Sequence, residues 1–264
     1  MADMKQLRTR IKSVDSTLHL TKAMGLVASS KIRRAGIAMQ KSRAYLDAVD
    51  GIMKNLTASA ECRRSPLMQK RGERTRLVVI AGDRGLAGGY NANVFRLVRE
   101  LEFDSILPIG KRACERYRAD FVSSEHFDAK DADRLASELI SGYLAGEFDR
   151  LGIVYTEYVS MMTQTARVKW VLPLEVGEST AVGTIFEPDR ESLLDAAAHE
   201  YVAGNVAHAV RESFASEVAA RRMAMDSAGK NAQQMIDDLT IEYNTARQSA
   251  ITQEITEIVA GSGN

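Results

Sequence analysis

The chain has 264 residues, 45% of them hydrophobic, and its 35 Lys and Arg balance 35 Asp and Glu. This apolar fraction is typical of a globular protein, and the balanced charge excludes any inference about partners from net charge alone. The two cysteines, Cys62 and Cys114, follow no metal or redox spacing and are interpreted as reduced structural thiols. No run of about 18 apolar residues and no signal-peptide stretch is present, so we expect a cytoplasmic protein without membrane insertion.

Prolines divide the chain into two outer segments and a middle. The four prolines are Pro66, Pro108, Pro173 and Pro188. Proline breaks a helix interior at a cost of about 3 kcal/mol. Segments 1–65 and 189–264 are therefore free to form uninterrupted helices.

Residues in the first segment repeat every seven positions. The two series, three residues apart as in a coiled coil, are Met4, Ile11, Leu18, Gly25, Ile32, Met39, Leu46, Met53 and Leu7, Val14, Thr21, Ala28, Ala35, Ser42, Val49, Leu56. Only Gly25, Thr21 and Ser42 are weak members. The pattern predicts a helix over about 3–57, roughly 80 Å long at 1.5 Å per residue. A globular core cannot absorb that length, so we predict a coiled-coil arm.

The middle of the chain alternates between apolar runs and helical stretches. After a polar segment at 58–74, which we interpret as a linker, the expected strands are 77–81, 105–109, 120–123, 151–156 and 168–174. The expected helices are 91–101, 111–118 and 131–145. Alternation of this kind favours a Rossmann-like α/β domain with a mostly parallel sheet. The last two strands have no helix between them, so one edge of the sheet is expected to be antiparallel.

A glycine-rich loop follows the first expected strand but lacks a nucleotide-binding spacing. Gly82, Gly85, Gly88 and Gly89 match neither G-x-G-x-x-G nor a P-loop. We interpret Asp83 and Arg84 as a local ion pair or as contacts to a partner. The four histidines form no metal spacing, and no Ser-His-Asp arrangement can be drawn. The sequence therefore predicts no catalytic, cofactor-binding or metal-binding residues.

The last segment complements the first. Its apolar stripe predicts a helix from about 189 to 259, and it carries six basic against eleven acidic residues over 190–258, whereas 1–56 carries eleven basic against four acidic. Opposite charge and matching stripes predict an antiparallel pair. If Leu56 and Arg190 lie side by side, Met4 lies opposite about residue 242, and about 16 residues extend further. This tip keeps an apolar face of Ile251, Ile255, Ile258 and Val259, which predicts contact with another protein.

Three segments of the sequence resemble the gamma subunit of rotary F-type ATP synthases. They are "IKSVDSTLHLTKAMGLVASSKIRRA", "GDRGLAGGYNANV" and "SEVAARRMAMDSAGKNAQQMIDDLTIEYNTARQSAITQEITEIV". The resemblance implies a non-catalytic central rotor shaft that couples rotation of the membrane c-ring, driven by ions, to ATP chemistry on the beta subunits. It implies alpha, beta and epsilon subunits and the c-ring as partners, no cofactor, and a peripheral position on the cytoplasmic face of a bacterial cell membrane.

The resemblance also assigns roles to single residues. It places Lys22, Ala23 and Met24 against the moving lever of a beta subunit, and Asp83, Arg84 and Gly85 in the foot near that lever. The positions that hydrogen-bond to the surrounding ring are Arg221, Gln248, Thr252 and Glu254, and the apolar tip fits a bearing in the ring. Gly25 departs from the family, which usually has a large polar residue there.

The implied architecture has four parts, with two alternatives left open. The parts are a coiled-coil helix at 1–58, a linker at 59–74, a foot domain at 75–187, and a second coiled-coil helix with the tip at 188–264. The alternatives are a nucleotide-binding Rossmann-type enzyme and a coiled-coil tether. A nucleic-acid-binding arm is a less favoured variant of the tether, because the chain supplies an acidic helix for its basic one.

Overall fold

The structure, a computed structural model, describes residues 2–177, 186–187 and 189–261. The chain divides into two compact units. The first contains Met1–Ser29 and Arg221–Asn264, and the second contains Ser30–Ala220. The four-part division drawn from the sequence remains a proposal.

Two long helices confirm the heptad prediction. Helix α1 spans Ala2–Thr57 and helix α5 spans Arg190–Gly261, and each contributes residues to both units. All sixteen heptad positions of α1 are buried or half-buried, including the weak members Thr21, Gly25 and Ser42. The period of seven therefore identified the buried side of the helix, although three of its positions hold small or polar residues.

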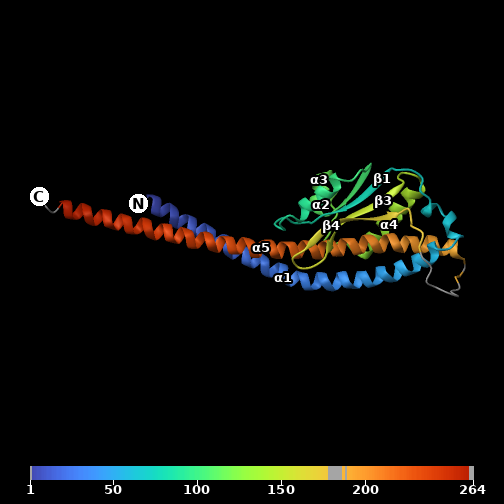
Figure 1. Ribbon diagram of the computed structural model, residues 1–264, viewed down its shortest axis with the longest axis horizontal. Helices are drawn as coiled ribbons and strands as arrows, with labels where there is room; N and C mark the ends of the chain where they lie inside the picture. The colour runs from blue at the N-terminus through green and yellow to red at the C-terminus, as the bar shows by residue number, and fades with distance from the viewer. Residues whose placement is uncertain (1, 178–185, 188, 262–264) are drawn as a thin grey trace. The chain divides into compact units, whose positions relative to one another are not determined.

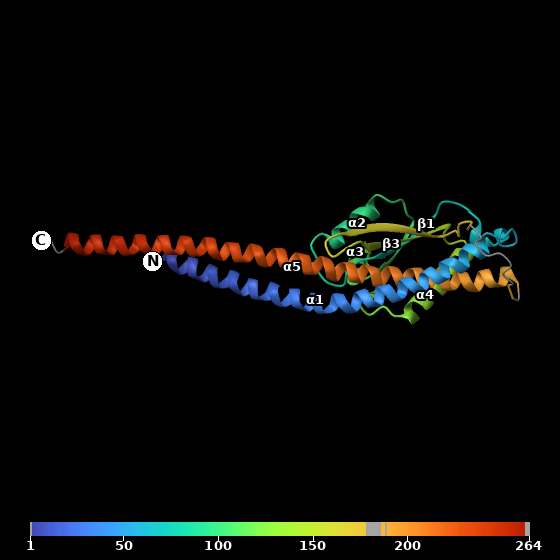
Figure 2. The same cartoon turned by 60° about the horizontal axis from the view of Figure 1, so that its bottom comes forward.

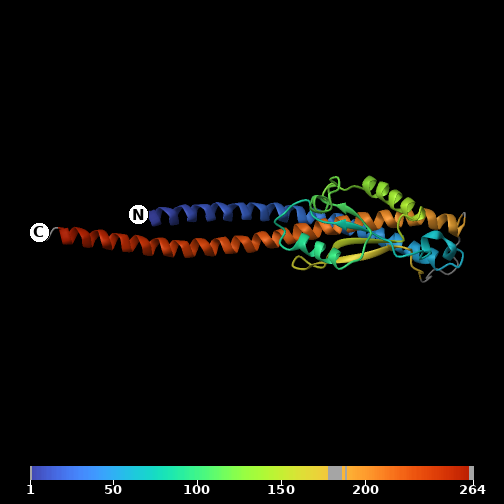
Figure 3. The ribbon, with the colours of Figure 1, turned by 90° about the horizontal axis from the view of Figure 1, so that it is seen from above.

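In the first unit, the beginning of α1 and the end of α5 lie side by side and antiparallel (Figure 3). A Cβ atom at Gly25 would lie 3.7 Å from Met225, and one at Gly229 would lie 3.5 Å from Thr21. This register carries Met4 to about residue 246, one turn beyond the expected residue 242, so α5 extends beyond Met4 by about 15 residues, or roughly 22 Å. In the second unit Gly204 contacts Tyr45 and Leu46, so the expected alignment of Leu56 with Arg190 was wrong by one turn.

The second unit contains a four-stranded sheet, drawn in Figure 1. Strands β1 (Thr75–Ile80), β2 (Ser105–Ile109), β3 (Arg150–Tyr158) and β4 (Gln164–Leu172) are ordered β2-β1-β3-β4. The pairs β1–β2 and β1–β3 are parallel, and β3–β4 is antiparallel. The expectation of a mostly parallel sheet with one antiparallel edge is confirmed.

The two faces of the sheet pack against different helices. On one face, Leu77, Val79 and Val154 pack with α2 (Tyr90–Arg99). On the other face, Val78 and Ile80 join a core with α4 (Ala129–Leu144), α5 and the end of α1. Figures 1 and 2 show α5 running beneath the sheet, with the last part of α1 beside α5. Alternate residues of one strand thus build two cores, and the long helices belong to one of them.

Two features of the middle segment differ from the sequence expectation. Residues 120–123 form no strand: Val122 accepts a single backbone bond from Gly110, at 2.8 Å, and the next residues bind Asp83 instead. The segment at 58–74 is not a plain polar linker, because it forms two 3-10 turns, Cys62–Arg64 and Pro66–Met68, with Cys62 and Leu67 buried in the core.

Gly110 makes the turn between β2 and α3 (Lys111–Tyr117) possible. Its φ is +93°, and an added Cβ atom would lie 1.9 Å from the carbonyl oxygen of Ala81. Only glycine fits this position without strain. The turn places the start of α3 beside the glycine-rich loop after β1, where Ala81 donates a backbone hydrogen bond to Ile109 at 2.9 Å.

Candidate functional site

The tip of α5 is exposed in the first unit, as the sequence predicts. Ile251, Ile255, Ile258 and Val259 are exposed by 48%, 57%, 70% and 65%. Residues 251–261 are all exposed, since this stretch lies beyond the start of α1 in the antiparallel register. Exposed branched side chains on one helix end are unfavourable in water.

Three of the residues expected to contact the ring lie near the tip of α5, and the fourth, Arg221, lies near the middle of the helix. Gln248, Thr252 and Glu254 are exposed, and Arg221 is half-buried. The Thr252 hydroxyl donates to the carbonyl oxygen of Gln248 at 2.9 Å, so this hydroxyl can still accept one bond from a partner. The side chains of Gln248 and Glu254 are exposed to solvent, so a partner could reach them without any rearrangement of the helix.

One of the residues expected to contact the lever, Lys22, lines a groove in the first unit. Lys22 and Ala23 are exposed and Met24 is half-buried. Beside them, a groove of about 560 Å³ opens at Gly25 and Gly229. A Cβ atom at Gly25 would lie 3.1 Å from Nη1 of Arg222. Gly25 thus leaves the room that the Arg222 guanidinium uses on the opposite helix.

Asp83 in the second unit organises the loops at the end of the sheet. Its carboxylate accepts hydrogen bonds from the Ser123 hydroxyl at 2.6 Å and from the backbone N–H groups of Lys111, Ser124 and Glu125, each at 3.0 Å. Burial alone raises the pKa of Asp83, but these bonds outweigh burial and lower it. The expected local ion pair with Arg84 is therefore wrong.

Arg84 instead joins a small ion-pair network that reaches α1. Its guanidinium lies 3.4 Å from Glu125, and the other oxygen of Glu125 binds Nζ of Lys31. Burial raises the pKa of Glu125, but Lys31 and Arg84 lower it by a larger amount. Gly85, the third expected foot residue, is half-buried next to Arg112. The foot loop and the long helix are thus connected through Glu125.

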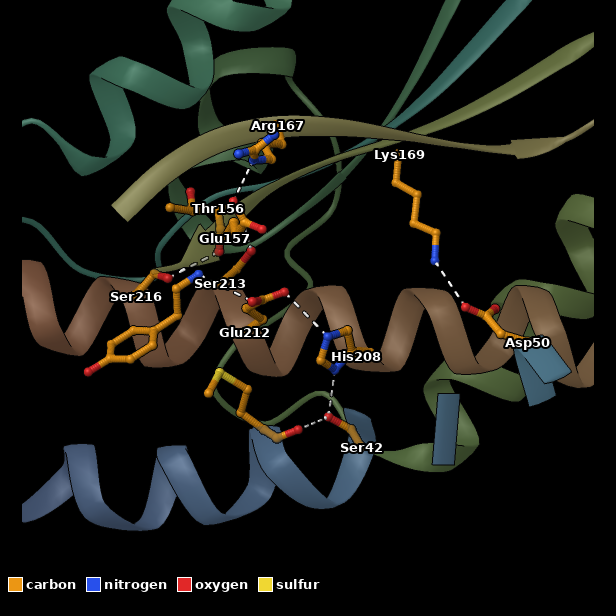
Figure 4. A network of polar contacts seen from close by, with 12 residues as sticks. Ser42, Asp50, Thr156, Glu157, Arg167, Lys169, His208, Glu212, Ser213 and Ser216 are labelled. Carbon is orange, nitrogen blue, oxygen red and sulfur yellow. Dashed lines mark hydrogen bonds and ion pairs between the residues drawn. The ribbon is translucent and has the colours of Figure 1, made fainter. Parts of the chain in front are cut away.

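A second connection joins β3 to α5, and Figure 4 shows it. Strand β3 continues past the paired part of β1, so its last residues have no partner strand on that side. Side chains of α5 take that place. Ser213 Oγ accepts from the Thr156 N–H at 3.0 Å, Ser216 Oγ donates to the Thr156 carbonyl at 3.1 Å, and Glu212 accepts from the Tyr158 N–H at 3.2 Å. A helix here completes the hydrogen bonding of a sheet edge.

The same contact extends to α1 through a buried histidine (Figure 4). His208 Nε2 lies 3.3 Å from Glu212, and its Nδ1 lies 3.0 Å from the Ser42 hydroxyl. The line Ser42–His208–Glu212 contains the residue types of a hydrolase triad, which sequence spacing did not reveal. Ser42 is only 4% exposed and its hydroxyl also lies 2.8 Å from the Met39 carbonyl, so no substrate can reach it. Its role is to join the two helices.

The glycine-rich loop is unsuited to a phosphate. The Gly82 N–H donates to Asn91 at 2.9 Å, and a Cβ atom at Gly82 would lie 2.7 Å from the carboxyl carbon of Glu217. The start of α3 is occupied by the Asp83 carboxylate. Two carboxylates of the chain therefore lie where a nucleotide phosphate would bind, and they repel it. This arrangement disfavours the nucleotide-binding enzyme.

The described part of the chain also bears on membrane spans and metal sites. Within residues 2–177, 186–187 and 189–261, no helix is both long and apolar enough to cross a bilayer. Among the same residues, no three His, Cys, Asp or Glu side chains gather as metal ligands.

Sequence comparisons place the chain among known proteins. A family model described as ATP synthase matches residues 3–263. The ATP synthase gamma chain of Ruminococcus albus is 39% identical, and the match covers 100% of this chain and 99% of the relative. The ATP synthase gamma chain of Geobacter sp. strain M21 is 38% identical, with 99% and 98% covered.

Solved structures share the fold at low sequence identity. A rotor chain of the Euglena gracilis mitochondrial ATP synthase matches with a TM-score of 0.65 and 17% identity, covering 95% of this chain and 99% of that chain. A chain of the Tetrahymena thermophila mitochondrial ATP synthase central stalk and c-ring matches with a TM-score of 0.64 and 21% identity, covering 79% and 99%. At these identities the likeness concerns the fold: two long helices and a small mixed sheet.

Proposed function

The chain belongs to the ATP synthase gamma-chain family, and on this premise we propose that it is the central rotor shaft of such a complex. The observation that carries the proposal is the tip of α5, which continues beyond α1 and ends in exposed apolar side chains. A shaft held inside a collar of other subunits needs such an end, because the collar buries the apolar surface that the chain alone leaves in water.

The assignments of single residues follow from this proposal. Lys22, Ala23 and Met24 contact the lever of a beta subunit. Arg221, Gln248, Thr252 and Glu254 hydrogen-bond to the alpha–beta ring, and Ile251, Ile255, Ile258 and Val259 turn in its bearing. Asp83, Arg84 and Gly85 belong to the foot, which meets the epsilon subunit and the c-ring. Exposure supports the roles of Lys22, Ala23, Arg84 and of the ring and tip residues at 248–259, whereas Met24, Gly85 and Arg221 are half-buried. The role of Asp83 is supported by its hydrogen bonds to the foot loops.

In this proposal the shaft has no catalytic site of its own. Rotation of the c-ring turns the shaft, and each beta subunit meets a different side of it in turn. The difference in contact free energy between the beta conformations is then the coupling between ion flow and ATP chemistry. The complex would hold the chain as a peripheral protein on the cytoplasmic face of a bacterial membrane.

Native affinity purification of the tagged full chain from its own cells tests the proposal. We expect alpha, beta and epsilon subunits to co-purify, and Ile255→Glu to reduce their recovery because it places a charge in the bearing. Gln253→Glu is the matched control, since it adds the same charge two residues away on the polar side of the helix. Recovery of the unmodified chain without alpha and beta subunits would contradict the shaft.

A further inference from the structure

A cavity of about 330 Å³ lies in the second unit between α1, α5 and the loop at 124–127. Its volume falls within the range of small-molecule sites. The cationic residues Lys31 and Arg34 line it from α1, and Arg211 lines it from α5. The rings of Phe127 and Phe214 supply apolar walls. The cavity is separate from the glycine-rich loop and from the contact between α5 and β3.

The loop side of the cavity holds an unsatisfied hydroxyl. Ser124 lines the cavity and is only 4% exposed, and within the described part of the chain its Oγ has no hydrogen-bond partner. Its backbone is fixed, since its N–H donates to Asp83 at 3.0 Å. A buried hydroxyl without a partner is costly, by about 1–3 kcal/mol. A ligand that accepts a hydrogen bond there would remove this cost.

The charges around the cavity favour an anion. Glu125 also lines it, but Lys31 and Arg84 neutralise this carboxylate. Among residues 2–177, 186–187 and 189–261, neither Arg34 nor Arg211 has an ion-pair partner. Two guanidinium groups without carboxylate partners thus border the same cavity as the Ser124 hydroxyl.

We propose that this cavity binds the phosphate group of a small molecule, either inorganic phosphate or a nucleotide. The planar guanidinium group matches phosphate oxygens in a bidentate manner. A phosphate can receive bonds from Arg34, Arg211 and Ser124 through three terminal oxygens, whereas a carboxylate has only two. The inference goes beyond the rotor function, since it concerns binding by the chain itself and needs no rotation.

Isothermal titration of the full chain with inorganic phosphate, AMP and adenosine tests the site. We expect one phosphate-dependent site per chain with a dissociation constant in roughly the millimolar range or below. Arg34→Gln and Arg211→Gln should each weaken binding about tenfold, because each removes a charged hydrogen bond. Ser124→Ala should weaken it about threefold or more.

The matched control is Arg33→Gln, which removes the same charge from the preceding residue of α1, a residue that does not line the cavity. We expect it to change binding less than about twofold in 0.15 M salt, since screening limits distant charges. Equal affinity for phosphate and AMP identifies inorganic phosphate as a sufficient ligand, and tighter binding of AMP identifies a nucleotide.

Three results would overturn the site: no saturable phosphate binding up to about 10 mM, equal loss in Arg33→Gln and Arg34→Gln, or binding of adenosine as tight as that of AMP. Circular dichroism of each variant establishes that it is folded. If only one of Arg34→Gln and Arg211→Gln folds, its phosphate affinity is compared with that of Arg33→Gln.

Discussion

Removal of one hydroxyl from α5 should open the end of β3. Ser213 Oγ accepts the Thr156 N–H at 3.0 Å, and both residues are buried. In Ser213→Ala this N–H loses its acceptor and has no access to water. A buried donor without a partner destabilises the folded state by about 1–3 kcal/mol. The gain in helix propensity from Ser to Ala, about 0.5 kcal/mol, offsets only a small part.

Amide hydrogen exchange at Thr156 measures this cost directly. A local loss of about 1–3 kcal/mol corresponds to exchange about 5 to 150 times faster, provided that the segment opens locally. Ser227→Ala is the control, because Ser227 is exposed on the same helix, and it should leave Thr156 unchanged. If Thr156 exchanges at the same rate in Ser213→Ala as in the parent chain, α5 does not supply the partner of this strand edge.

Four further variants test other features of the two units. Asp83→Asn should destabilise the second unit by about 1–3 kcal/mol at pH 7. Because the pKa of Asp83 is lowered in the folded state, its stabilisation is present above the unfolded pKa of about 3.9 and is lost as pH falls through the folded pKa. In urea unfolding, the difference in unfolding free energy between the parent chain and Asp83→Asn should therefore shrink in acid. Gly36→Ala, with nothing within 4 Å of the new Cβ, should raise stability by about 1 kcal/mol. Gly25→Ala should gain less, since Arg222 must shift, and equal gains in thermal unfolding would show that Arg222 does not use that space. Deletion of 253–264 should change the free energy of unfolding by less than about 0.5 kcal/mol, while alpha and beta subunits co-purify less well. Unchanged co-purification would exclude the bearing.

The long helices could be predicted because their signal is local and repeated. Seven-residue spacing and the absence of proline act along the whole of α1, so the small or polar residues Thr21, Gly25 and Ser42 did not hide the pattern. The expected strand at 120–123 failed for the opposite reason. Its apolar residues suggested pairing, but the chain there makes one bond to Gly110 and then turns toward Asp83, a contact 40 residues distant in sequence.

The contact between α5 and β3 could not be predicted from spacing, since Thr156 and Ser213 are 57 residues apart. A weaker signal was present. Glu212 and Glu217 lie in a helix with many exposed charges, yet both are buried, at 3% and 2% exposure. Because α5 is buried on most sides between 209 and 219, its polar residues there need bonds to other elements, and the structure identifies that element for Glu212 as β3.

The dependence of β3 on α5 has a consequence for biosynthesis. A ribosome releases the strands of the sheet well before it reaches residues 212–216, so a nascent chain must hold the end of β3 with its N–H and C=O groups facing water or a chaperone. Only when the last third of the polypeptide emerges can these groups be paired. Premature termination before α5 should therefore yield a fragment that aggregates through this open edge.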